Sequence, residues 1–335
     1  MMIFQNIEFH NVEEIVPFED GWKLHRAPSA VRAQCSEGLQ NTSLYGTGVE
    51  LRFVLLGDHA DVRLRTLPIA EGQMAFVYYG SIQGGWQQSS FVITERETVI
   101  RIPRPGNMEQ LKQISAAAHL PFSPEVVRLV LPYGNNVFLG AEGDVMPPTP
   151  DMLPKRTLLS YGSSITHGSL ALIAPYAYPF RIAQKLGMDT LNKGFAGTCR
   201  CEKAMAEWFV SRKDWHAMTL EMGINMLGMS EAEFERRIDE FTAIMAADGR
   251  PVFATSLFHF NGEHFGADQG RGQRFRDIVR KYAEPRLHFV DGLELLERPD
   301  FISQDMVHPS LEGIIQITDR WTEIIRRQLP ENFFI

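Results

Sequence analysis

The chain of 335 residues is long for one domain and sufficient for two. With 44% hydrophobic and 22% charged residues, it has the composition of an ordinary globular protein that can build a core. Its net charge of -8 argues against nonspecific binding to nucleic acid or to an anionic membrane. We therefore expect neither nucleic acid nor a membrane among its partners.

The N-terminal stretch, MMIFQNIEFHNVEEIV, lacks the basic start, the apolar run and the cleavage site of a secretory signal. No segment has enough consecutive apolar residues to cross a bilayer. The three cysteines, an odd number, do not suggest a disulfide framework, so we expect a cytoplasmic protein. Cys199 and Cys201 have no second Cys/His pair at zinc spacing, and we expect no metal site. The sequence is compatible with a homo-oligomer.

The first half of the chain has the pattern of β structure. Short runs rich in β-branched and aromatic residues are separated by glycine, proline and asparagine; they cover residues 49–56, 61–67, 74–80, 98–102 and 126–132. Such strands pack naturally as two stacked antiparallel sheets, so we predict an all-β sandwich of the jelly-roll type. Residues 107–120 have a weaker helical pattern. Trp86, on a glycine-flanked turn, is expected in the core rather than stacked on a sugar.

Four prolines between residues 147 and 154 interrupt the pattern. Proline disfavours helix and cannot donate to a sheet, so this segment is predicted to be a stiff connector. We place an N-terminal domain at residues 1–148 and a catalytic domain at residues 149–335.

Strands and helices alternate after the connector. The predicted strands begin at residues 157, 189, 217, 251 and 286. The predicted helices cover residues 178–187, 202–212, 231–249, 273–283 and 309–329, and the third opens with a capping-box pattern. This alternation predicts a parallel sheet with helices on both faces, a three-layer α/β/α arrangement of the flavodoxin-like kind. Ligands bind at the carboxyl ends of the strands in such sheets.

Chemically useful residues follow four of these strands. Two adjacent serines lie within residues 162–166, a glycine turn spans residues 192–199, an asparagine ends residues 223–225, and an Asp-x-x-His pair spans residues 305–308. In a parallel sheet all four segments gather at one edge. They would supply the nucleophile, the oxyanion donors and the oriented base that acyl transfer requires.

These segments resemble the sequence blocks of the SGNH hydrolases, also called the GDSL esterase/lipase family. The family's blocks are Gly-Asp-Ser-(Leu/Ile)-Thr, Asn-x-Gly-x-x-Gly, Gly-x-Asn-Asp and Asp-x-x-His. Their counterparts appear here in the same order at residues 162–166, 192–197, 223–226 and 305–308. The resemblance covers residues from about 155 to 328 and implies the α/β/α fold of that family.

The resemblance implies that Ser164, which precedes Ile-Thr, is the nucleophile. Ser163 then stands in the place of the family's aspartate, and Met226 replaces the second polar residue of the third block. Both departures remove carboxylates that would connect the loops, so the order of the loops is expected to depend on other bonds.

The same resemblance implies that His308 is the general base and that Asp305 orients it. It also implies an oxyanion hole made by the backbone N–H groups of Ser164 and Gly197 and the side-chain amide of Asn225. The residues themselves leave simpler alternatives open. Ser164 could be a helix cap, Gly197 a plain turn glycine, and Asn225 the cap of the helix near Ser230.

The resulting functional hypothesis is a serine esterase that needs no cofactor. Two-domain members of the family with a β-sandwich often resemble carbohydrate deacetylases, so the expected substrate is a small, acetyl-like ester of a carbohydrate or a secondary metabolite. An acyltransferase with the same residues and an alcohol acceptor is the first alternative. A catalytically decayed carbohydrate-binding protein is the second.

Overall fold

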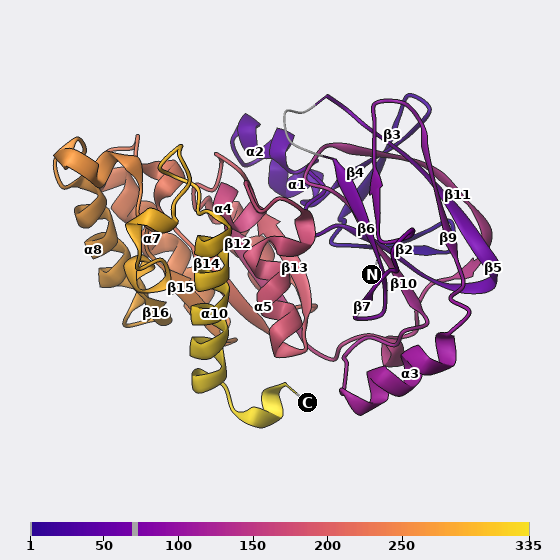
Figure 1. The fold of residues 1–335 in the computed structure, drawn as a ribbon. Helices are drawn as coiled ribbons and strands as arrows, with labels where there is room; N and C mark the ends of the chain where they lie inside the picture. The colour runs from indigo at the N-terminus through magenta and orange to yellow at the C-terminus, as the bar shows by residue number, and fades with distance from the viewer. Residues whose placement is uncertain (1, 69–72, 335) are drawn as a thin grey trace.

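The computed structural model of the chain describes residues 2–68 and 73–334. An antiparallel, sheet-rich N-terminal region lies beside a C-terminal region in which helices cover a parallel sheet (Figure 1). The predicted parallel sheet with helices is therefore confirmed, and so is the antiparallel, all-β character of the N-terminal region, although its described strands form one continuous sheet and not two separate stacked sheets. The last antiparallel strand ends at Met146 and the first parallel strand begins at Thr157, so the predicted boundary falls in the connection between them.

Within the described residues, eleven strands form one antiparallel sheet in the order β3-β4-β11-β5-β10-β6-β7, with β1, β2, β8 and β9 paired off this path. The strands are β1 (Ile3–Phe4), β2 (Ile7–His10), β3 (Glu14–Phe18), β4 (Gly21–His25), β5 (Glu50–Thr66), β6 (Met74–Tyr79), β7 (Ile82–Gln83), β8 (Ser90–Val92), β9 (Thr98–Pro103), β10 (Val126–Val130) and β11 (Asn136–Met146).

One long strand organises this sheet. The sequence predicts two strands at 49–56 and 61–67, but both belong to β5, which is 17 residues long. Its first part pairs with β2 and β10, and its second part pairs with β9 and β11. The register with β11 shifts near Gly140 and Gly143, both at positive φ, and such irregularities bend a sheet. The bent sheet surrounds a core to which β2, β4, β5, β6, β9, β10 and β11 contribute.

The prediction that Trp86 lies in the core is wrong, because its side chain is 98% exposed. The residue lies in the turn between β7 and β8, and both of these short strands pair with β6. This turn projects from the sheet, and glycines at 84 and 85 provide no side chains to cover the ring.

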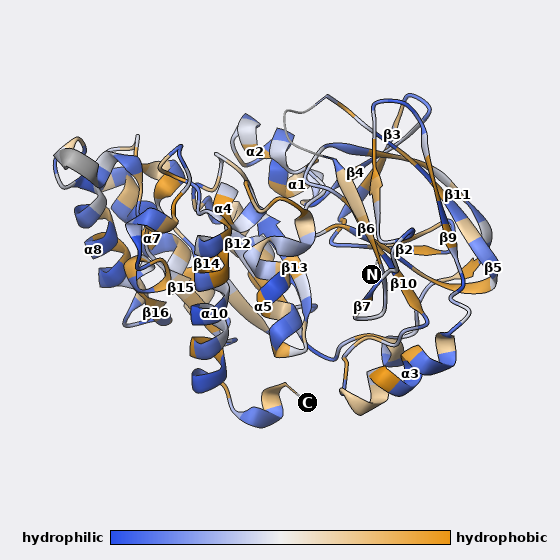
Figure 2. Ribbon diagram, in the orientation of Figure 1, coloured by the Kyte–Doolittle hydropathy of each residue, from blue (hydrophilic) through white to orange (hydrophobic). Residues whose placement is uncertain are grey.

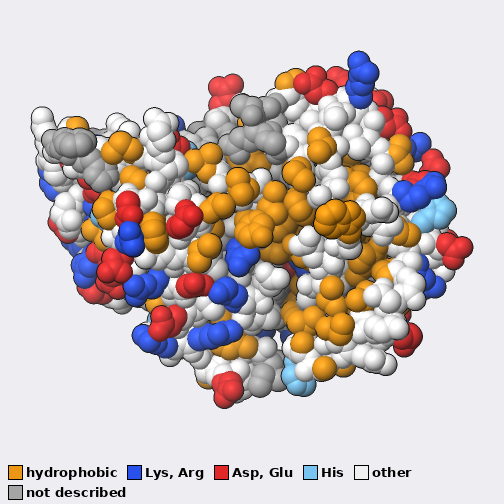
Figure 3. Space-filling model, in the orientation of Figure 1, with side chains coloured by type: hydrophobic (Ala, Val, Ile, Leu, Met, Phe, Trp, Pro, Cys, Tyr) orange, Lys and Arg blue, Asp and Glu red, His pale blue; other side chains and the backbone are white. Residues whose placement is uncertain are grey.

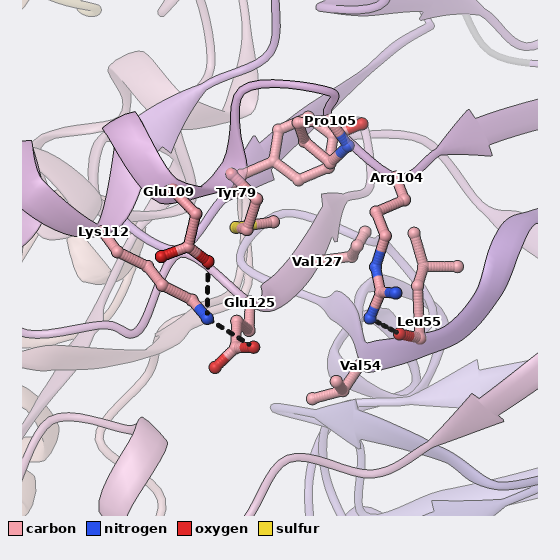
Figure 4. Close-up of a pocket in the computed structure, with 10 residues that line it drawn as sticks. Val54, Leu55, Tyr79, Arg104, Pro105, Glu109, Lys112, Glu125 and Val127 are labelled. Atoms are coloured by element: carbon pink, nitrogen blue, oxygen red, sulfur yellow. Dashed lines mark hydrogen bonds and ion pairs between the residues drawn. The ribbon is translucent and has the colours of Figure 1, made fainter.

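The three N-terminal helices have different partners. α3 (Met108–Ala117) follows β9 and borders a pocket of about 240 Å³ over Val54 and Val127, where Lys112 pairs with Glu109 and Glu125 (Figure 4). α1 (Ser29–Arg32) and α2 (Glu37–Thr42) instead pack against the C-terminal region. Leu39 of α2 belongs to the same hydrophobic cluster as many side chains of that region.

The parallel sheet has five strands in the described part of the chain, in the order β13-β12-β14-β15-β16. They are β12 (Thr157–Gly162), β13 (Asp189–Gly194), β14 (Ala217–Glu221), β15 (Val252–Thr255) and β16 (His288–Val290). The helices are α4 (Ser164–His167), α5 (Tyr178–Leu186), α6 (Lys203–Ser211), α7 (Glu231–Ala247), α8 (Arg271–Ala283), α9 (Gly292–Leu295) and α10 (Leu311–Gln328). Short 3-10 turns are η1 (Pro150–Met152), η2 (Ala174–Tyr176), η3 (Ile224–Met226), η4 (Asn261–Gly266), η5 (Pro299–Phe301) and η6 (Glu331–Phe333).

The helices cover both faces of this sheet, as the strand–helix alternation predicts. α5 and α10 share one hydrophobic cluster with the sheet, and α6, α7 and α8 share another. The helices are amphipathic: Figure 2 shows outward turns of α8 and α10 in blue, while α10 buries Ile317 and Trp321. Ser230 caps α7 by accepting the N–H of Glu233, which confirms the predicted start of that helix. No helix in the described ranges is long and apolar enough to span a membrane.

Buried ion pairs join the two regions. Arg52 of β5 donates two hydrogen bonds, of 2.7 and 2.6 Å, to the carboxylate of Asp189 at the start of β13. Glu50 accepts from Arg52 and from Arg128, and all four side chains are buried. Separating the two regions would leave Arg52 and Asp189 without their partners, and an uncompensated buried charge is costly. The network therefore holds β13 against the N-terminal sheet.

Candidate active site

Ser164 lies at the carboxyl end of a central strand of the parallel sheet. β12 ends at Gly162, and Ser164 is the first residue of the one-turn helix α4. Ser163 is the helix cap, since its hydroxyl accepts the N–H of Ile165 at 3.1 Å. A Cβ at Gly162 would lie 2.0 Å from the hydroxyl of Thr166, so only glycine fits there. Ser163 therefore caps the helix, and the hydroxyl of Ser164 is available for other contacts.

The structure brings the predicted Ser, His and Asp side chains together. The Oγ atom of Ser164 is 2.9 Å from Nε2 of His308, and Nδ1 of His308 is 2.7 Å from Oδ2 of Asp305. Ser164 is 144 residues from His308 in the sequence, and folding alone places them in hydrogen-bonding distance.

A tight turn holds Asp305 in its charged form. Burial raises the pKa of this carboxyl, but hydrogen bonds outweigh that effect and hold the pKa well below its usual range. Oδ1 accepts the hydroxyl of Ser303 at 2.7 Å and the backbone N–H groups of Val307 and His308 at 2.9 Å each. Asp305 is therefore ionised at neutral pH, with Oδ2 directed to the imidazole.

The donors of the predicted oxyanion hole are not bonded to other acceptors in the described part of the chain. Among residues 2–68 and 73–334, no acceptor is bonded to the backbone N–H of Ser164 or Gly197. Gly197 is exposed and has φ of +70°, a conformation that favours glycine although a Cβ would meet nothing within 4 Å. The Oδ1 atom of Asn225 accepts the N–H of Cys199 at 3.1 Å, which leaves its Nδ2 as the available donor. Asn225 does not cap α7, because Ser230 does.

Sequence reasoning missed Glu221, which lies beneath the serine turn. This buried carboxylate at the end of β14 accepts the N–H and the hydroxyl of Ser163, at 3.0 and 2.6 Å, and the hydroxyl of Thr166 at 2.7 Å. Burial raises its pKa, and these hydrogen bonds oppose the rise. Glu221 thus supplies a carboxylate that connects two loops, although Ser163 stands where the family pattern has aspartate. An acidic residue at the end of an otherwise uncharged strand was the available signal.

Replacing Glu221 by leucine is expected to lower the free energy of unfolding by about 3 kcal/mol, because the buried Ser163 N–H and two hydroxyls lose a charged acceptor. Glu221→Gln keeps an acceptor oxygen and nearly the same volume. It should therefore lower the free energy of unfolding by less than half as much as Glu221→Leu. Urea denaturation of the two variants beside the parent measures both values. Equal losses would show that the carboxyl geometry is unimportant here.

Arg26 of the N-terminal region reaches under the same loops, and sequence reasoning missed it too. The buried guanidinium donates to backbone carbonyls of Tyr45 at 2.5 Å, Asn192 at 2.9 Å and Thr42 at 3.0 Å. Burial lowers its pKa to about 9, so it remains charged at neutral pH. Asn192 is the first residue of the glycine turn, and its Nδ2 donates to the carbonyl of Thr166. The N-terminal region is therefore bonded directly to the loops of the site.

His167, the last residue of α4, is fully buried between these groups. Nε2 is 3.3 Å from the guanidinium of Arg26, and Nδ1 is 3.2 Å from the backbone N of Ala196 in the glycine turn. The ring stacks on Tyr133 at 4.3 Å. Burial and the charge of Arg26 hold the pKa of His167 well below its ordinary value, so the ring is neutral. Since a neutral imidazole accepts at one nitrogen only, one of the two contacts is a hydrogen bond at a time.

The neutral His167 predicts that stability falls in mild acid. Below about pH 6.5 the unfolded chain protonates this histidine and the folded chain does not, so stability present above that pH is lost as the pH falls. The expected slope from this residue is about 1.4 kcal/mol per pH unit. Urea denaturation between pH 7.5 and 5.5 measures it. His167→Gln should lower the slope by about this amount and leave the part due to other buried histidines, such as His25, whose pKa burial lowers to about 4. His59→Gln, at an exposed site, should leave the slope unchanged; the opposite pattern would exclude His167 as the cause.

In the part of the chain that is described, no group of three or more His, Cys, Asp or Glu side chains could hold a metal ion. Cys199 and Cys201 are buried free thiols beside the site.

Comparison with known proteins agrees with this architecture. Residues 160–313 match the model of the GDSL-like lipase/acylhydrolase family. Among solved structures, the chain is similar to a salicylyl-acyltransferase from a tetracycline biosynthetic pathway, at 16% identity and a TM-score of 0.71 over 96% of this chain and 94% of the other. No curated protein sequence matches the chain.

Two further structures are carbohydrate esterases of family two. The enzyme from Cellvibrio japonicus has 12% identity and a TM-score of 0.61, with 97% of each chain covered. The enzyme from Clostridium thermocellum, in complex with cellohexaose, has 14% identity and a TM-score of 0.53 over 84% of this chain and 91% of the other. At these identities the likeness concerns the fold, which spans both regions.

Proposed function

We propose that the protein is a serine ester hydrolase with Ser164 as its nucleophile, since residues 160–313 match the model of the GDSL-like lipase/acylhydrolase family. The observation that carries the proposal is the hydrogen-bonded series from Ser164 through His308 to Asp305, with contacts of 2.9 and 2.7 Å. A serine hydroxyl is a weak nucleophile until a neighbouring base takes its proton.

In the first half of the reaction, Ser164 Oγ attacks the ester carbonyl while His308 Nε2 takes the hydroxyl proton. Asp305 accepts a hydrogen bond from the Nδ1–H of the ring, which fixes the tautomer and stabilises the imidazolium. The C–O bond to the alcohol then breaks, and His308 returns the proton to the departing alkoxide. In the second half, water attacks the acyl-enzyme with the same base, releasing the acid and restoring Ser164.

The negative charge of the tetrahedral intermediate requires donors that need no rearrangement. The free backbone N–H groups of Ser164 and Gly197 and the Nδ2 of Asn225 are suited to this role. His167 and Arg26 would position the peptide that precedes Gly197, through the contacts to Ala196 and Asn192. The N-terminal region would thus support the oxyanion loop.

The alcohol part of the ester is proposed to be a carbohydrate, since two neighbours are carbohydrate esterases and one of them binds cellohexaose. Transfer of the acyl group to an alcohol other than water is the second candidate, because another neighbour is a salicylyl-acyltransferase. Incubation with an ester donor and candidate alcohols distinguishes them: free acid alone supports hydrolysis, and new esters support transfer.

A direct test of the proposed nucleophile is labelling with a fluorophosphonate, followed by mass spectrometry of the peptides. Label on Ser164 together with hydrolysis of p-nitrophenyl acetate is the expected result. Label on another residue, or no reaction with either reagent, would overturn the proposal.

A further inference from the structure

An apolar pocket begins one helical turn beyond Ser164. It has a volume of about 230 Å³ and lies between the two regions of the chain. One wall is formed by residues 168–174 after α4, and the other by Thr47, Met74, Pro132 and Tyr133 of the N-terminal region. Nothing in the proposed reaction so far uses it.

The loop after α4 tethers this pocket to the serine. The backbone N–H groups of Gly168 and Ser169 both donate to the carbonyl of Ser164, at 2.9 and 3.0 Å. Four residues of helix rise about 6 Å, so the pocket wall starts about that far along α4 from Ser164. An acetyl group bound to the serine would not fill this pocket, whereas a longer acyl chain could enter it.

Two leucines on the pocket wall have backbone conformations that folding does not favour. Leu170 and Leu172 have φ of +61° and +62°, in the left-handed region. A residue with a Cβ is strained in that region, and glycine or asparagine is tolerated better. Burial of the two side chains offsets little of this strain, because 41% of Leu170 and 72% of Leu172 are exposed. Strained, exposed apolar side chains at a pocket indicate a ligand rather than a packing role.

The surrounding surface is also apolar. Val92 pairs with Met74 across β8 and β6 and is 62% exposed, and Tyr176 beyond the loop is 43% exposed. Figure 3 shows hydrophobic side chains gathered over the boundary between the two regions. Single exposed apolar residues are ordinary, but a group of them at a pocket marks a binding surface.

We propose that this pocket binds the acyl group of the substrate, and that this group is apolar and longer than acetyl. The inference rests on the proposed esterase mechanism. In that mechanism the leaving alcohol must lie beside His308, which returns the proton to its oxygen, and the acyl substituent points away from it. Among the described lining residues, none comes from the segment 299–310 that carries His308. On this ground the proposal assigns the pocket to the acyl side of the site.

The test is the acyl preference with a constant leaving group. For p-nitrophenyl acetate, butyrate and hexanoate, kcat/KM should rise about fourfold for each methylene that the pocket buries. The double variant Leu170→Asn/Leu172→Asn tolerates the left-handed backbone and removes the apolar side chains. Its hexanoate-to-acetate ratio of kcat/KM should fall about tenfold. Leu56→Asn, which removes a leucine that is 49% exposed outside the pocket, should leave the ratio unchanged.

Several outcomes separate the two proposals. If acetate is hydrolysed but hexanoate is no better, or if the double variant keeps the parental ratio, the acyl pocket is overturned and the esterase stands. If the double variant instead changes the preference between ethyl and hexyl acetate alone, the pocket holds the alcohol and the inference is wrong. Absence of all hydrolysis together with absence of labelling at Ser164 would overturn the esterase itself.

Discussion

Replacing Ser164 by alanine is expected to lower kcat for p-nitrophenyl acetate by about 10⁴- to 10⁶-fold. The substitution removes the only atom proposed to bond covalently to the acyl group, while His308 and Asp305 remain. Because Ser164 Oγ is 2.9 Å from His308 and takes part in no helix cap, its loss should leave the fold intact. Initial rates and circular dichroism of the purified variant measure the two effects.

Ser163→Ala is the matched control, one residue away on the same turn. It should retain a substantial part of the activity, because the hydroxyl of Ser163 faces Glu221 and Ile165 rather than the imidazole. It should also lower stability by about 1–2 kcal/mol, since a helix cap and a donor to a buried carboxylate are lost. An inactive Ser163→Ala beside an active Ser164→Ala would mean that the assignment of the two serines is reversed.

Asn225→Ala is expected to lower kcat by about 10²- to 10³-fold with a much smaller change in KM, because an oxyanion donor acts mainly in the transition state. Steady-state kinetics with p-nitrophenyl acetate separates the two parameters. Asn225→Asp tests the sign of the charge: a carboxylate could still accept the N–H of Cys199 but would repel an oxyanion. It should be at least as inactive as the alanine variant.

A control for the asparagine variants is Asn41→Ala, at an exposed residue of α2. This variant should have parental kinetics. If Asn225→Ala raised KM and left kcat unchanged, the amide would bind substrate without stabilising the intermediate, and the proposed oxyanion hole would be wrong.

The sequence was most informative where chemistry depends on short local patterns. The positions of Ser164, Asn225, Asp305 and His308 after predicted strands of one parallel sheet indicated that they would meet at one edge of it. The Asp305–His308 pair lies within one turn, so its contact follows from local geometry. The two runs within β5 were harder to interpret, because Gly57 and its neighbours resemble a turn although the strand continues through them.

Some contacts could not be predicted because they join residues that no local pattern connects. Glu221 is 58 residues from Ser163, and Arg26 is 166 residues from Asn192. In sequence each resembles an ordinary charged residue near a strand. Only burial, which removes water as an alternative partner, makes their hydrogen bonds to the loops of the site obligatory.

The sequence by itself determined the two kinds of sheet and the set of side chains suited to acyl transfer, since hydrophobic periodicity and strand-end motifs are local properties. The tertiary structure decided how those side chains are supported and what lies beside them. Glu221 under Ser163, Arg26 under the glycine turn, and the pocket between Leu172 and Tyr133 exist only because chain packing brings distant surfaces together and excludes water from between them.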